Sequence, residues 1–328
     1  PGRCQPFSCA ATSVLITGER ASMKVVVFGA GGVGGYFGAR LAAAGNDVGF
    51  VARGRHLEAI RKKGLTVRSG LGDLHLPSPR ASDDASTLGA ADVVLFAVKL
   101  WDTESAAAAV RPLLAKGGVV IPFQNGVESV ERIGAVVGPE RVLGGAAYIA
   151  ATISEPGTIT HTGTMARLRF GALAPAQVAS AKAFHSACVA ARIDAELVDD
   201  VRRIVWEKFV FLAAMSGVTS VTRCSIGPIR TDPDMRETLR LAIEETWRLA
   251  RARGIGLDDN FVAKQLAFAD GLPEEMKSSM LNDLIAGRRL DAPWLAGAVA
   301  RMSREQGLAA PVNATIYAAL KPYSEGRT

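Results

Sequence analysis

The sequence of 328 residues has few cysteines, few histidines and no long apolar run, and each shortage excludes a class of protein. None of the four cysteines belongs to a Cys-x-x-Cys pair, and no cysteine and histidine stand at the spacing of a zinc site. We therefore expect a reducing compartment, the cytoplasm, with no disulfide framework and no bound metal. No stretch approaches the ~18 uninterrupted apolar residues of a membrane-spanning helix, so we expect no membrane association.

The chain also has only a small excess of positive over negative charge. The sequence contains 38 Lys and Arg against 32 Asp and Glu, a net charge of +6. The basic residues form no block or stripe, which disfavours a nucleic-acid partner, and the mild excess suits an anionic small molecule equally well. With 48% hydrophobic and 21% charged residues the chain can form a core, and its length suggests about two domains.

The first 22 residues differ in pattern from the rest of the chain. They show no helical or strand periodicity, whereas Met23 directly precedes a strand pattern at residues 24–28. We interpret residues 1–22 as an extension ahead of the folded chain and expect it to be disordered. An organellar transit peptide is the alternative, because Arg3 and Arg20 lie among serines and threonines with a single acid.

From Met23 onward, short apolar runs alternate with amphipathic stretches. Unbroken apolar runs of this length suit parallel strands that are buried on both faces of a sheet. Their alternation with helices predicts an α/β fold with a Rossmann-type, doubly wound parallel sheet. The predicted strands are residues 24–28, 47–52, 92–98 and 118–123, with a first helix over 36–44 and irregular short strands over 65–80.

The pattern changes between residues 141 and 171. Two segments, 158–162 and 167–170, alternate with a period of two, and Gly163 separates them. This pattern predicts an antiparallel addition to the edge of the sheet. A helix over 175–191 and a short strand over 194–198 complete the first domain.

Strand patterns disappear after Asp199 and helical periodicity takes their place. Asp234 and Asp258 stand at suitable N-cap positions. We place the boundary near residue 198, between an NADP-binding Rossmann domain over 23–198 and an all-helical substrate and catalytic domain over 199–328. The predicted helices are residues 200–215, 234–253, 258–269, 273–286, 291–306 and 311–320.

The first chemical motif is the glycine-rich turn after the first strand. The first glycine of such a turn permits its tight geometry, the second lets a pyrophosphate approach the backbone, and the third allows close packing of helix and strand. The strand–turn–helix context favours a dinucleotide site over a loop that serves packing alone. The residues of the turn are Gly29, Ala30, Gly31, Gly32, Val33 and Gly34.

The end of the second strand bears on which dinucleotide binds. An NAD enzyme usually carries an acid there, but Asp47 opens the strand and Arg53 follows its end. A guanidinium suits a 2′-phosphate, so Arg53 favours NADP(H). The alternative is that Arg53 and Arg55 are solvated loop charges, which is what we expect of Arg55.

Polar segments also follow the next two strands. Lys99 and Asn125 both fall at carboxyl ends of predicted parallel strands, where open α/β sheets bind ligands. Lys99 can reach a cofactor or a substrate there. Asn125 and Gly126 also form a common turn sequence, so position alone leaves a site and a turn equally open.

The helical region contains a lysine in unusual surroundings. Lys208 lies in a helix whose neighbouring residues are mostly apolar, so it either extends its ammonium to solvent or has a chemical function. Farther along the chain, residues 277–283 place polar groups on one helix. Asp291 follows eight residues later and also suits a helix cap ahead of Pro293.

Taken together, these motifs resemble the ketopantoate reductase family (2-dehydropantoate 2-reductases) over nearly all of residues 23–320. The resemblance implies a Rossmann domain followed by a helical domain, reduction of a 2-oxo acid by NADPH, and an active site in the cleft between the domains. It rests on KVVVFGAGGVGG at 24–35, Arg53, VKLW at 98–101, QNGV at 124–127, WEKF at 206–209, SSMLND at 278–283 and the spacing to Asp291.

The resemblance also implies roles for single residues. Lys208 matches the catalytic lysine, Asn125 the cleft asparagine near nicotinamide and substrate, and Ser279 a serine that binds polar groups of the substrate. Lys99 matches a cleft lysine that contacts cofactor or substrate. Arg53 matches the ligand of the 2′-phosphate.

The chain departs from the family around the substrate's hydroxyl end. Asp291 stands where the family has a glutamate that helps orient the lysine and substrate, and Pro293 replaces a second acid. Leu212 and Ser216 stand where asparagines are expected. These changes leave hydride transfer intact, remove polar partners and favour a more apolar 2-oxo acid.

The sequence therefore predicts NADPH-dependent reduction of a 2-oxo acid to a 2-hydroxy acid, with 2-dehydropantoate to (R)-pantoate in pantothenate biosynthesis as the leading reaction. Lys208 would donate the proton, while Asp291 and Asn125 orient the reacting groups. The alternatives are a reductase of a more apolar 2-oxo acid and a non-catalytic NADP(H)-binding regulatory protein. A homodimer through Trp294 and the later helices is compatible with the sequence, as is a monomer.

Overall fold

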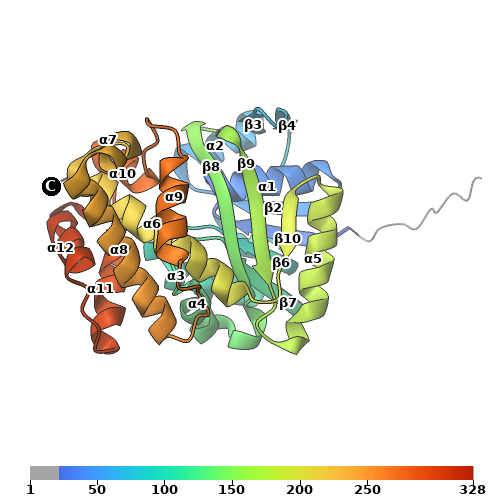
Figure 1. Cartoon of the computed structure of the whole chain (residues 1–328). Helices are drawn as coiled ribbons and strands as arrows, with labels where there is room; N and C mark the ends of the chain where they lie inside the picture. Colours follow the sequence, from blue (N-terminus) through green and yellow to red (C-terminus); the bar gives the residue numbers. More distant parts are fainter. Residues whose placement is uncertain (1–21, 328) are drawn as a thin grey trace, which may run out of the picture.

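The computed structural model describes residues 22–327 as an α/β region and a helical region that lie side by side (Figure 1). The extension predicted over residues 1–22, with Cys4 and Cys9, lies outside the described residues except for Ser22. Within the described part of the chain, Cys188 and Cys224 are free thiols.

The first sheet consists of parallel strands, as the alternation of apolar runs and helices predicts. Its strand order is β5-β2-β1-β6-β7, and every neighbouring pair is parallel. The order reverses between β1 and β6, so the crevice outside their carboxyl ends is where a sheet of this kind binds ligands. The strands are β1 (Lys24–Phe28), β2 (Asp47–Val51), β5 (Arg80–Ser82), β6 (Ala91–Phe96) and β7 (Leu114–Pro122).

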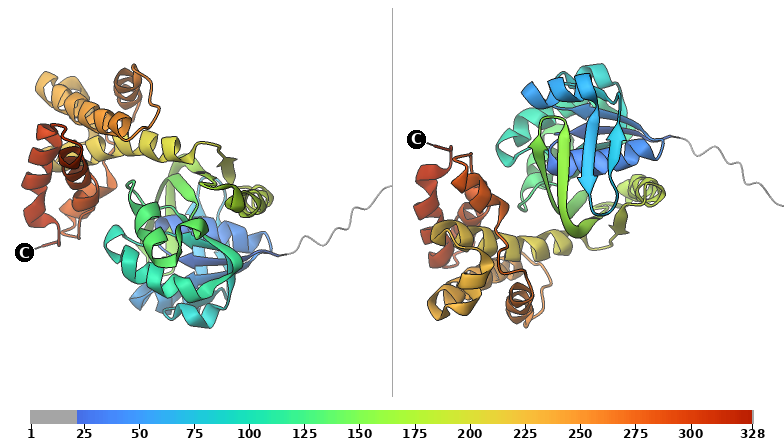
Figure 2. Two further views of the ribbon diagram at one scale, coloured as in Figure 1. Left: turned by 90° about the horizontal axis from the view of Figure 1, so that it is seen from below. Right: turned by 90° about the horizontal axis from the view of Figure 1, so that it is seen from above.

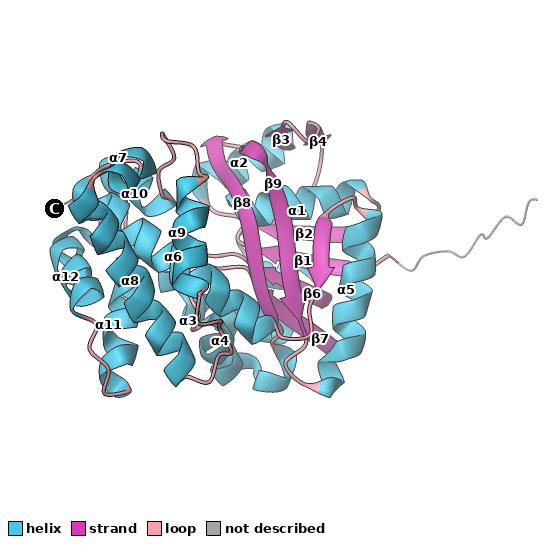
Figure 3. Cartoon of the chain, viewed as in Figure 1, coloured by secondary structure: helices cyan, strands magenta, loops and turns pink. Residues whose placement is uncertain are grey.

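Helices cover both faces of this sheet (Figure 3). On one face, α3 and α4 pack with Phe28 and Phe96, and on the other face α1 packs with Val27 and Phe50. The Rossmann-type, doubly wound arrangement is therefore confirmed. The helices of this region are α1 (Gly32–Ala43), α2 (Gly54–Lys63), α3 (Thr103–Val110), α4 (Ser129–Val137) and α5 (Val178–Ala190).

A second sheet takes the place of the predicted addition to the first sheet's edge, and that prediction is wrong. Its order is β10-β9-β3-β4, with β8 paired to β9. Helix α1 contacts strands of both sheets, so it lies between them and keeps them apart (Figure 2). The strands are β3 (Leu65–Ser69), β4 (Leu74–Leu76), β8 (Gly144–Glu155), β9 (Thr158–Gly171) and β10 (Asp194–Leu197).

Gly163 does not separate two strands, contrary to the prediction. The segments 158–162 and 167–170 both belong to β9, which pairs with β8 in an antiparallel manner. Residues 163–165 have no partners on β8, because the pairing moves from Thr162 directly to Ala166. They form a bulge in one continuous strand, and alternation on either side of a bulge resembles two short strands.

The region after β10 consists of helices packed around the long helix α6 (Figure 1). Helices α8, α10, α11 and α12 all contact α6, and their buried residues form one apolar core. An all-helical second region is thereby confirmed. The helices are α6 (Val201–Thr222), α7 (Ile226–Thr231), α8 (Pro233–Ala252), α9 (Phe261–Asp270), α10 (Ser279–Ile285), α11 (Ala296–Glu305) and α12 (Pro311–Leu320).

Both predicted N-caps of this region are wrong. The N-cap of α8 is Asp232, whose carboxylate accepts from the backbone N–H groups of Asp234 and Met235. Pro233 occupies the first helical position, which shifts the cap two residues towards the N-terminus. Helix α9 begins after Asn260, and Asp258 instead binds Lys264.

Helix α6 is the one helix among residues 22–327 that is long and apolar enough to cross a membrane. In the most apolar 18-residue window, 67% of its residues are buried by the rest of the protein. Its hydropathy is therefore accounted for by the central place of α6 in the helical core. We propose the segment between Leu197 and Val201, which connects β10 to α6, as the boundary between the two domains.

Candidate active site

The glycine-rich turn connects β1 to α1 and lies against the end of β6. Gly29 has a φ of +103°, and a Cβ atom there would lie 2.9 Å from the backbone of Ala97. A Cβ atom on Gly34 would lie 2.2 Å from the carbonyl oxygen of Gly29. The first and third glycines of the motif are thus required by the close approach of backbone segments.

Gly31, the second glycine of the motif, lies in open surroundings. A Cβ atom on it would have no atom within 4 Å, and as N-cap of α1 it offers no side chain to the first amides of the helix. Those amides have no partner within the helix, and the helix dipole favours negative charge there. The turn therefore presents an accessible row of donors that fits the pyrophosphate of a dinucleotide.

Arg53 lies at the N-terminus of α2 and is exposed over 66% of its side chain. Its guanidinium stands 3.8 Å from the carboxylate of Asp102, which belongs to the turn after β6. A contact of this length between exposed groups contributes little to stability, so Arg53 remains able to bind another anion. Asp102, which sequence reasoning missed, brings a negative charge to the same place.

Lys208 projects from α6 towards the first domain. Its ammonium donates to Oδ1 of Asn125 at 3.1 Å and to the carbonyl oxygen of Ala147 at 2.8 Å, and it lies 5.7 Å from the ring centre of Tyr148. Withdrawal from water lowers the pKa of Lys208 to about 8. The interpretation that extends this ammonium into solvent is therefore wrong, and a chemical function for Lys208 stays a prediction.

Asn125 follows the end of β7, in a segment that its neighbours fix. The side chain of Gln124 is buried and donates to the carbonyl oxygen of Val98 and to the hydroxyl of Thr103, tying the ends of β6 and β7 together. Gly126 has a φ of +88°, and residues 125–127 form a bend. The bend and the contact with Lys208 therefore coexist.

Asp291 is buried beside Asn125, with 7% of its surface exposed. Its Oδ1 atom has no hydrogen-bond partner among the described residues, and its side chain caps no helix. Burial raises the pKa of Asp291, while the charge of Lys99 and the amide of Asn125 act in the opposite direction. A buried acceptor without a hydrogen-bond donor destabilises the fold unless a ligand donates a hydrogen bond to it.

Lys99 reaches across to the helical region. Its ammonium lies 3.1 Å from Oδ2 of Asp283 in α10, and Arg288 binds the other oxygen of that carboxylate at 2.7 Å. Half of the Lys99 side chain is exposed, and its ammonium also lies 5.4 Å from the ring centre of Trp101. Asp283 belongs to the SSMLND motif, but sequence reasoning did not single it out.

The two serines of that motif have different surroundings. Ser278 is buried at the N-cap of α10, where its hydroxyl accepts from the N–H of Leu281 and forms a 2.7 Å hydrogen bond with the hydroxyl of Thr219. Ser279 is exposed and has no side-chain hydrogen bond within residues 22–327. Ser279 is therefore the serine that remains available to a ligand.

Aromatic residues join the two regions beside the site. The rings of Trp101 and Trp294 lie 6.2 Å apart, and the guanidinium of Arg289 lies 4.8 Å from the centre of the Trp101 ring. Trp294 thus has a partner within its own chain. Tyr148, within β8, belongs to no motif and was missed by sequence reasoning, whereas Trp101 belongs to the VKLW motif but was given no role of its own.

His56 joins the glycine-rich turn to the hairpin between β8 and β9 through two hydrogen bonds. Its Nδ1 accepts the N–H of Gly157, so its Nε2 carries the proton and donates to the carbonyl oxygen of Ala30 at 2.9 Å. Burial lowers the pKa of His56, which keeps the ring neutral. Among the described residues, no group of three or more His, Cys, Asp or Glu is arranged to hold a metal.

Comparison with known proteins gives matches over both regions. The profile of the family "Ketopantoate reductase PanE/ApbA" matches residues 25–175, and that of "Ketopantoate reductase PanE/ApbA C terminal" matches residues 200–324. The uncharacterized oxidoreductase YkpB of Bacillus subtilis is 32% identical, over 92% of this chain and 99% of the relative. The 2-dehydropantoate 2-reductase of Mesorhizobium japonicum is 31% identical, over 86% and 92%.

A solved structure agrees with these matches. The PanE/ApbA family ketopantoate reductase from Ralstonia eutropha JMP134 superposes with a TM-score of 0.84 at 31% sequence identity. The match covers 92% of this chain and 98% of that one. The likeness therefore extends over both the sheet region and the helical region.

Proposed function

The chain belongs to the ketopantoate reductase family, and on that premise we propose that it reduces 2-dehydropantoate to (R)-pantoate with NADPH. The observation that carries the proposal is the meeting of Lys208 from the helical region with Asn125 from the sheet region, where Asn125 also lies beside the buried Asp291. These groups lie at the carboxyl edge of the first sheet, where the cofactor and a 2-oxo acid would meet.

When bound, the cofactor supplies the hydride that reduces the C2 carbonyl carbon. Gly31 and the first amides of α1 would hold the pyrophosphate, and Arg53 would bind the 2′-phosphate. Asn125 and Lys99 would lie against the nicotinamide end. The full set of proposed cofactor-binding residues is Gly29, Ala30, Gly31, Gly32, Val33, Gly34, Arg53, Lys99 and Asn125.

Lys208 is the proposed proton donor. An ammonium has three N–H donors, and Asn125 and Ala147 accept two of them, which leaves one for the carbonyl oxygen of the substrate. As hydride adds to C2, that oxygen takes the proton and becomes the hydroxyl of the product. With a pKa of about 8, Lys208 is charged at neutral pH and can still release its proton readily.

The remaining residues would orient the substrate. Ser279 has a free hydroxyl and Lys99 a positive charge, so both suit the substrate carboxylate or a hydroxyl. Asp291 has an unpartnered buried oxygen, which a substrate hydroxyl would satisfy. This oxygen favours the hydroxyl-bearing 2-dehydropantoate among 2-oxo acids.

A second candidate substrate is a more apolar 2-oxo acid. Leu212 lies one helical turn after Lys208 and packs with the apolar core, where the family resemblance leads us to expect an asparagine. An apolar side chain at that position would pack against an alkyl or aryl group better than against a hydroxyl. Leu212 thus supports this alternative, whereas Asp291 supports 2-dehydropantoate.

The test is a spectrophotometric measurement of NADPH oxidation with a panel of 2-oxo acids that includes 2-dehydropantoate and aliphatic and aryl analogues without a hydroxyl. We expect the highest kcat/KM for 2-dehydropantoate, and a kcat lower by a factor of ~10²–10⁴ in Lys208→Ala. Direct NADPH binding is measured in parallel by fluorescence titration. Binding without oxidation of any substrate would instead favour a non-catalytic regulatory protein.

The cellular setting follows from the same proposal. We infer a cytoplasmic enzyme whose partner is a small 2-oxo acid, with no nucleic acid and no membrane involved. The dispersed basic residues and the burial of α6 support this inference. A homodimer remains a proposal to be tested by the mass of the protein in solution.

A further inference from the structure

Tyr148 lies next to Lys208 and has no part in the reaction proposed above. The preceding residue, Ala147, accepts a hydrogen bond from the Lys208 ammonium at 2.8 Å, and the same ammonium lies 5.7 Å from the centre of the Tyr148 ring. Successive side chains of a strand point to opposite faces of the sheet, so Tyr148 points away from the core that buries Ala147 and towards α6. Strand β8 thus presents both a backbone acceptor and an aromatic ring to one lysine.

The ring of Tyr148 is restrained at its hydroxyl end. The hydroxyl lies beside the guanidinium of Arg169 on the neighbouring strand β9, and that guanidinium donates to both carboxylate oxygens of Glu196 at 2.8 and 2.9 Å. Glu196 belongs to β10, which pairs with β9 on its other side. An ion pair between two strands therefore holds the tip of the ring, while the backbone of β8 holds its base.

The position of the ring determines how water can reach the Lys208 ammonium. Asn125 at 3.1 Å and Ala147 at 2.8 Å are the polar partners of this ammonium within residues 22–327. Tyr148 is half-buried, so its ring separates the ammonium from the adjoining protein surface. A cation is attracted to an aromatic face within ~6 Å, and at 5.7 Å this attraction is close to its limit. The larger effect of the ring is therefore the exclusion of water.

Exclusion of water also explains the state of Lys208 better than any nearby charge does. Withdrawal from water is the cause that lowers the pKa of Lys208 to about 8. None of the charged groups on the elements packed around the ammonium forms an ion pair with it in the described part of the chain. These groups are Glu207, which binds Arg203 at 2.8 Å, Arg169, which binds Glu196, Lys99, which binds Asp283 at 3.1 Å, and Asp291, which lies beside Asn125.

We propose that Tyr148 is a positioning residue for the reduction, because its ring closes the solvent side of Lys208 and keeps water from the N–H that faces the substrate. This inference rests on the proposed function, since it concerns the neighbour of the proposed proton donor. Without the ring, water solvates the ammonium, which then holds its proton more tightly. The ring thus sets how readily Lys208 releases a proton, and the hydroxyl of Tyr148 serves only to hold the ring.

The test is a pH titration of Lys208 by NMR in the full chain with isotopically labelled lysines. The chemical shift of the ε-methylene group follows the protonation of each lysine, and the Lys208 signal is identified by its loss in Lys208→Arg. The midpoint in the parent protein is expected at about pH 8. This measurement requires no turnover and is therefore independent of the proposed function. The pH profile of kcat/KM for reduction is measured in parallel.

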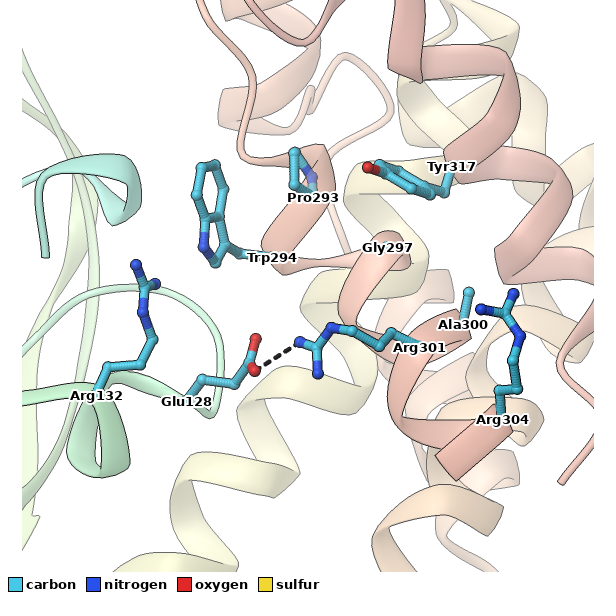
Figure 4. Close-up of a pocket in the computed structure, with 9 residues that line it drawn as sticks. All are labelled: Glu128, Arg132, Pro293, Trp294, Gly297, Ala300, Arg301, Arg304 and Tyr317. Carbon is cyan, nitrogen blue, oxygen red and sulfur yellow. Dashed lines mark hydrogen bonds and ion pairs between the residues drawn. The ribbon is translucent and has the colours of Figure 1, made fainter. Parts of the chain in front are cut away.

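Three variants separate the ring from the hydroxyl and from the contact between the two regions. Tyr148→Val removes the ring but suits a strand, and it should raise both the Lys208 midpoint and the declining limb of the profile by about one pH unit. Tyr148→Phe keeps the ring and should leave both at about pH 8. Glu128→Gln removes the 2.6 Å ion pair between Glu128 and Arg301, which joins the two regions without involving Lys208 or Tyr148 (Figure 4). The midpoint should not change in this control.

Three results would overturn the proposal. One is the same Lys208 midpoint in Tyr148→Val as in the parent protein. Another is an equal rise in Tyr148→Phe, which would assign the effect to the hydroxyl, and the third is an equal rise in Glu128→Gln, which would assign it to a loosened domain contact. A midpoint that rises in Tyr148→Val while the profile of reduction stays in place would instead refute proton donation by Lys208, and the exclusion of water by Tyr148 would stand. If Tyr148→Val fails to fold, Tyr148→Thr, which has nearly the same shape, takes its place.

Discussion

The ammonium of Lys208 and the side-chain oxygen of Asn125 lie 3.1 Å apart, although 83 residues separate them in the chain. This hydrogen bond joins the central helix of the helical region to the carboxyl end of a strand in the Rossmann sheet. The carbonyl oxygen of Ala147 holds the same ammonium from a second side. The lysine is thus fixed in direction, and that arrangement exists only when both regions are in contact.

Lys208→Ala is expected to lower kcat for 2-oxo acid reduction by a factor of ~10²–10⁴, because the proton donor is lost. NADPH affinity should stay unchanged, since no cofactor contact is assigned to this side chain. Steady-state kinetics and fluorescence titration of NADPH measure the two quantities. Lys182→Ala, an exposed lysine on α5, is the matched control and should retain full activity. Near-normal kcat in Lys208→Ala would refute the assignment.

The pH dependence of reduction should follow the protonation of Lys208. Withdrawal from water lowers the pKa of its ammonium from 10.5 to about 8, so the charged donor is present below about pH 8 and is lost above it. We expect kcat/KM for reduction to decline above about pH 8, and the reverse oxidation to rise over the same interval. The declining limb should vanish in Lys208→Arg, whose guanidinium stays charged. A profile flat to about pH 10 would contradict this role.

Alanine substitutions at the adjacent glycines Gly31 and Gly32 should affect different properties: cofactor affinity at Gly31 and stability at Gly32. Gly31→Ala places its Cβ in open space, so stability should change by less than ~0.5 kcal/mol while NADPH affinity falls. Gly32→Ala places its Cβ 2.0 Å from the carbonyl oxygen of Ala151 and should lower the free energy of unfolding by ~1–3 kcal/mol. Urea denaturation and NADPH titration measure the two effects. If both variants changed the free energy of unfolding and the NADPH affinity by the same amounts, Gly31 would not face the cofactor.

Cofactor choice should depend on the opposing charges of Arg53 and Asp102. Arg53→Gln is expected to raise the Kd for NADPH roughly tenfold or more and to leave that for NADH unchanged, since only NADPH carries the 2′-phosphate. Asp102→Asn removes the nearby negative charge and should tighten NADPH binding. Direct titration with both cofactors tests this, with Glu58→Gln on α2 as a control that has no ion pair among the described residues. A uniform change for both cofactors would place the 2′-phosphate elsewhere.

Much of the fold was predictable because its signals are local. The apolar run at 24–28 and the adjoining glycine turn specify strand, turn and helix within a few residues, and the parallel sheet results from their repetition. The bulge at residues 163–165 was not predictable, since it exists only relative to β8. The same holds for the N-cap at Asp232, where a second aspartate two residues later offered an equal pattern.

The residues of the candidate site were predictable from the sequence, but the side chains that contact them were not. Lys208, Asn125 and Asp291 were found through motifs, and the structure places both Lys208 and Asp291 beside Asn125. Lys99 was expected to face a cofactor or substrate, and its ion pair with Asp283 depends on how α10 packs against the first region. Tyr148 belongs to no motif, so only the packing of β8 under α6 reveals its ring beside the ammonium.

Substrate preference should depend on Leu212. It lies one turn from Lys208 on the same face of α6, so its side chain is placed to meet the group attached to the carbonyl of the substrate. Leu212→Asn supplies a donor and an acceptor, so kcat/KM for 2-dehydropantoate should rise relative to that for an apolar 2-oxo acid. One polar partner is worth ~1 kcal/mol, which corresponds to a ratio of about fivefold. The measurement is the ratio of the two kcat/KM values in parent and variant, with Leu212→Met as the volume-matched apolar control. An unchanged ratio in Leu212→Asn would mean that Leu212 packs away from the substrate, and Asp291 would then remain as the residue that reads the hydroxyl.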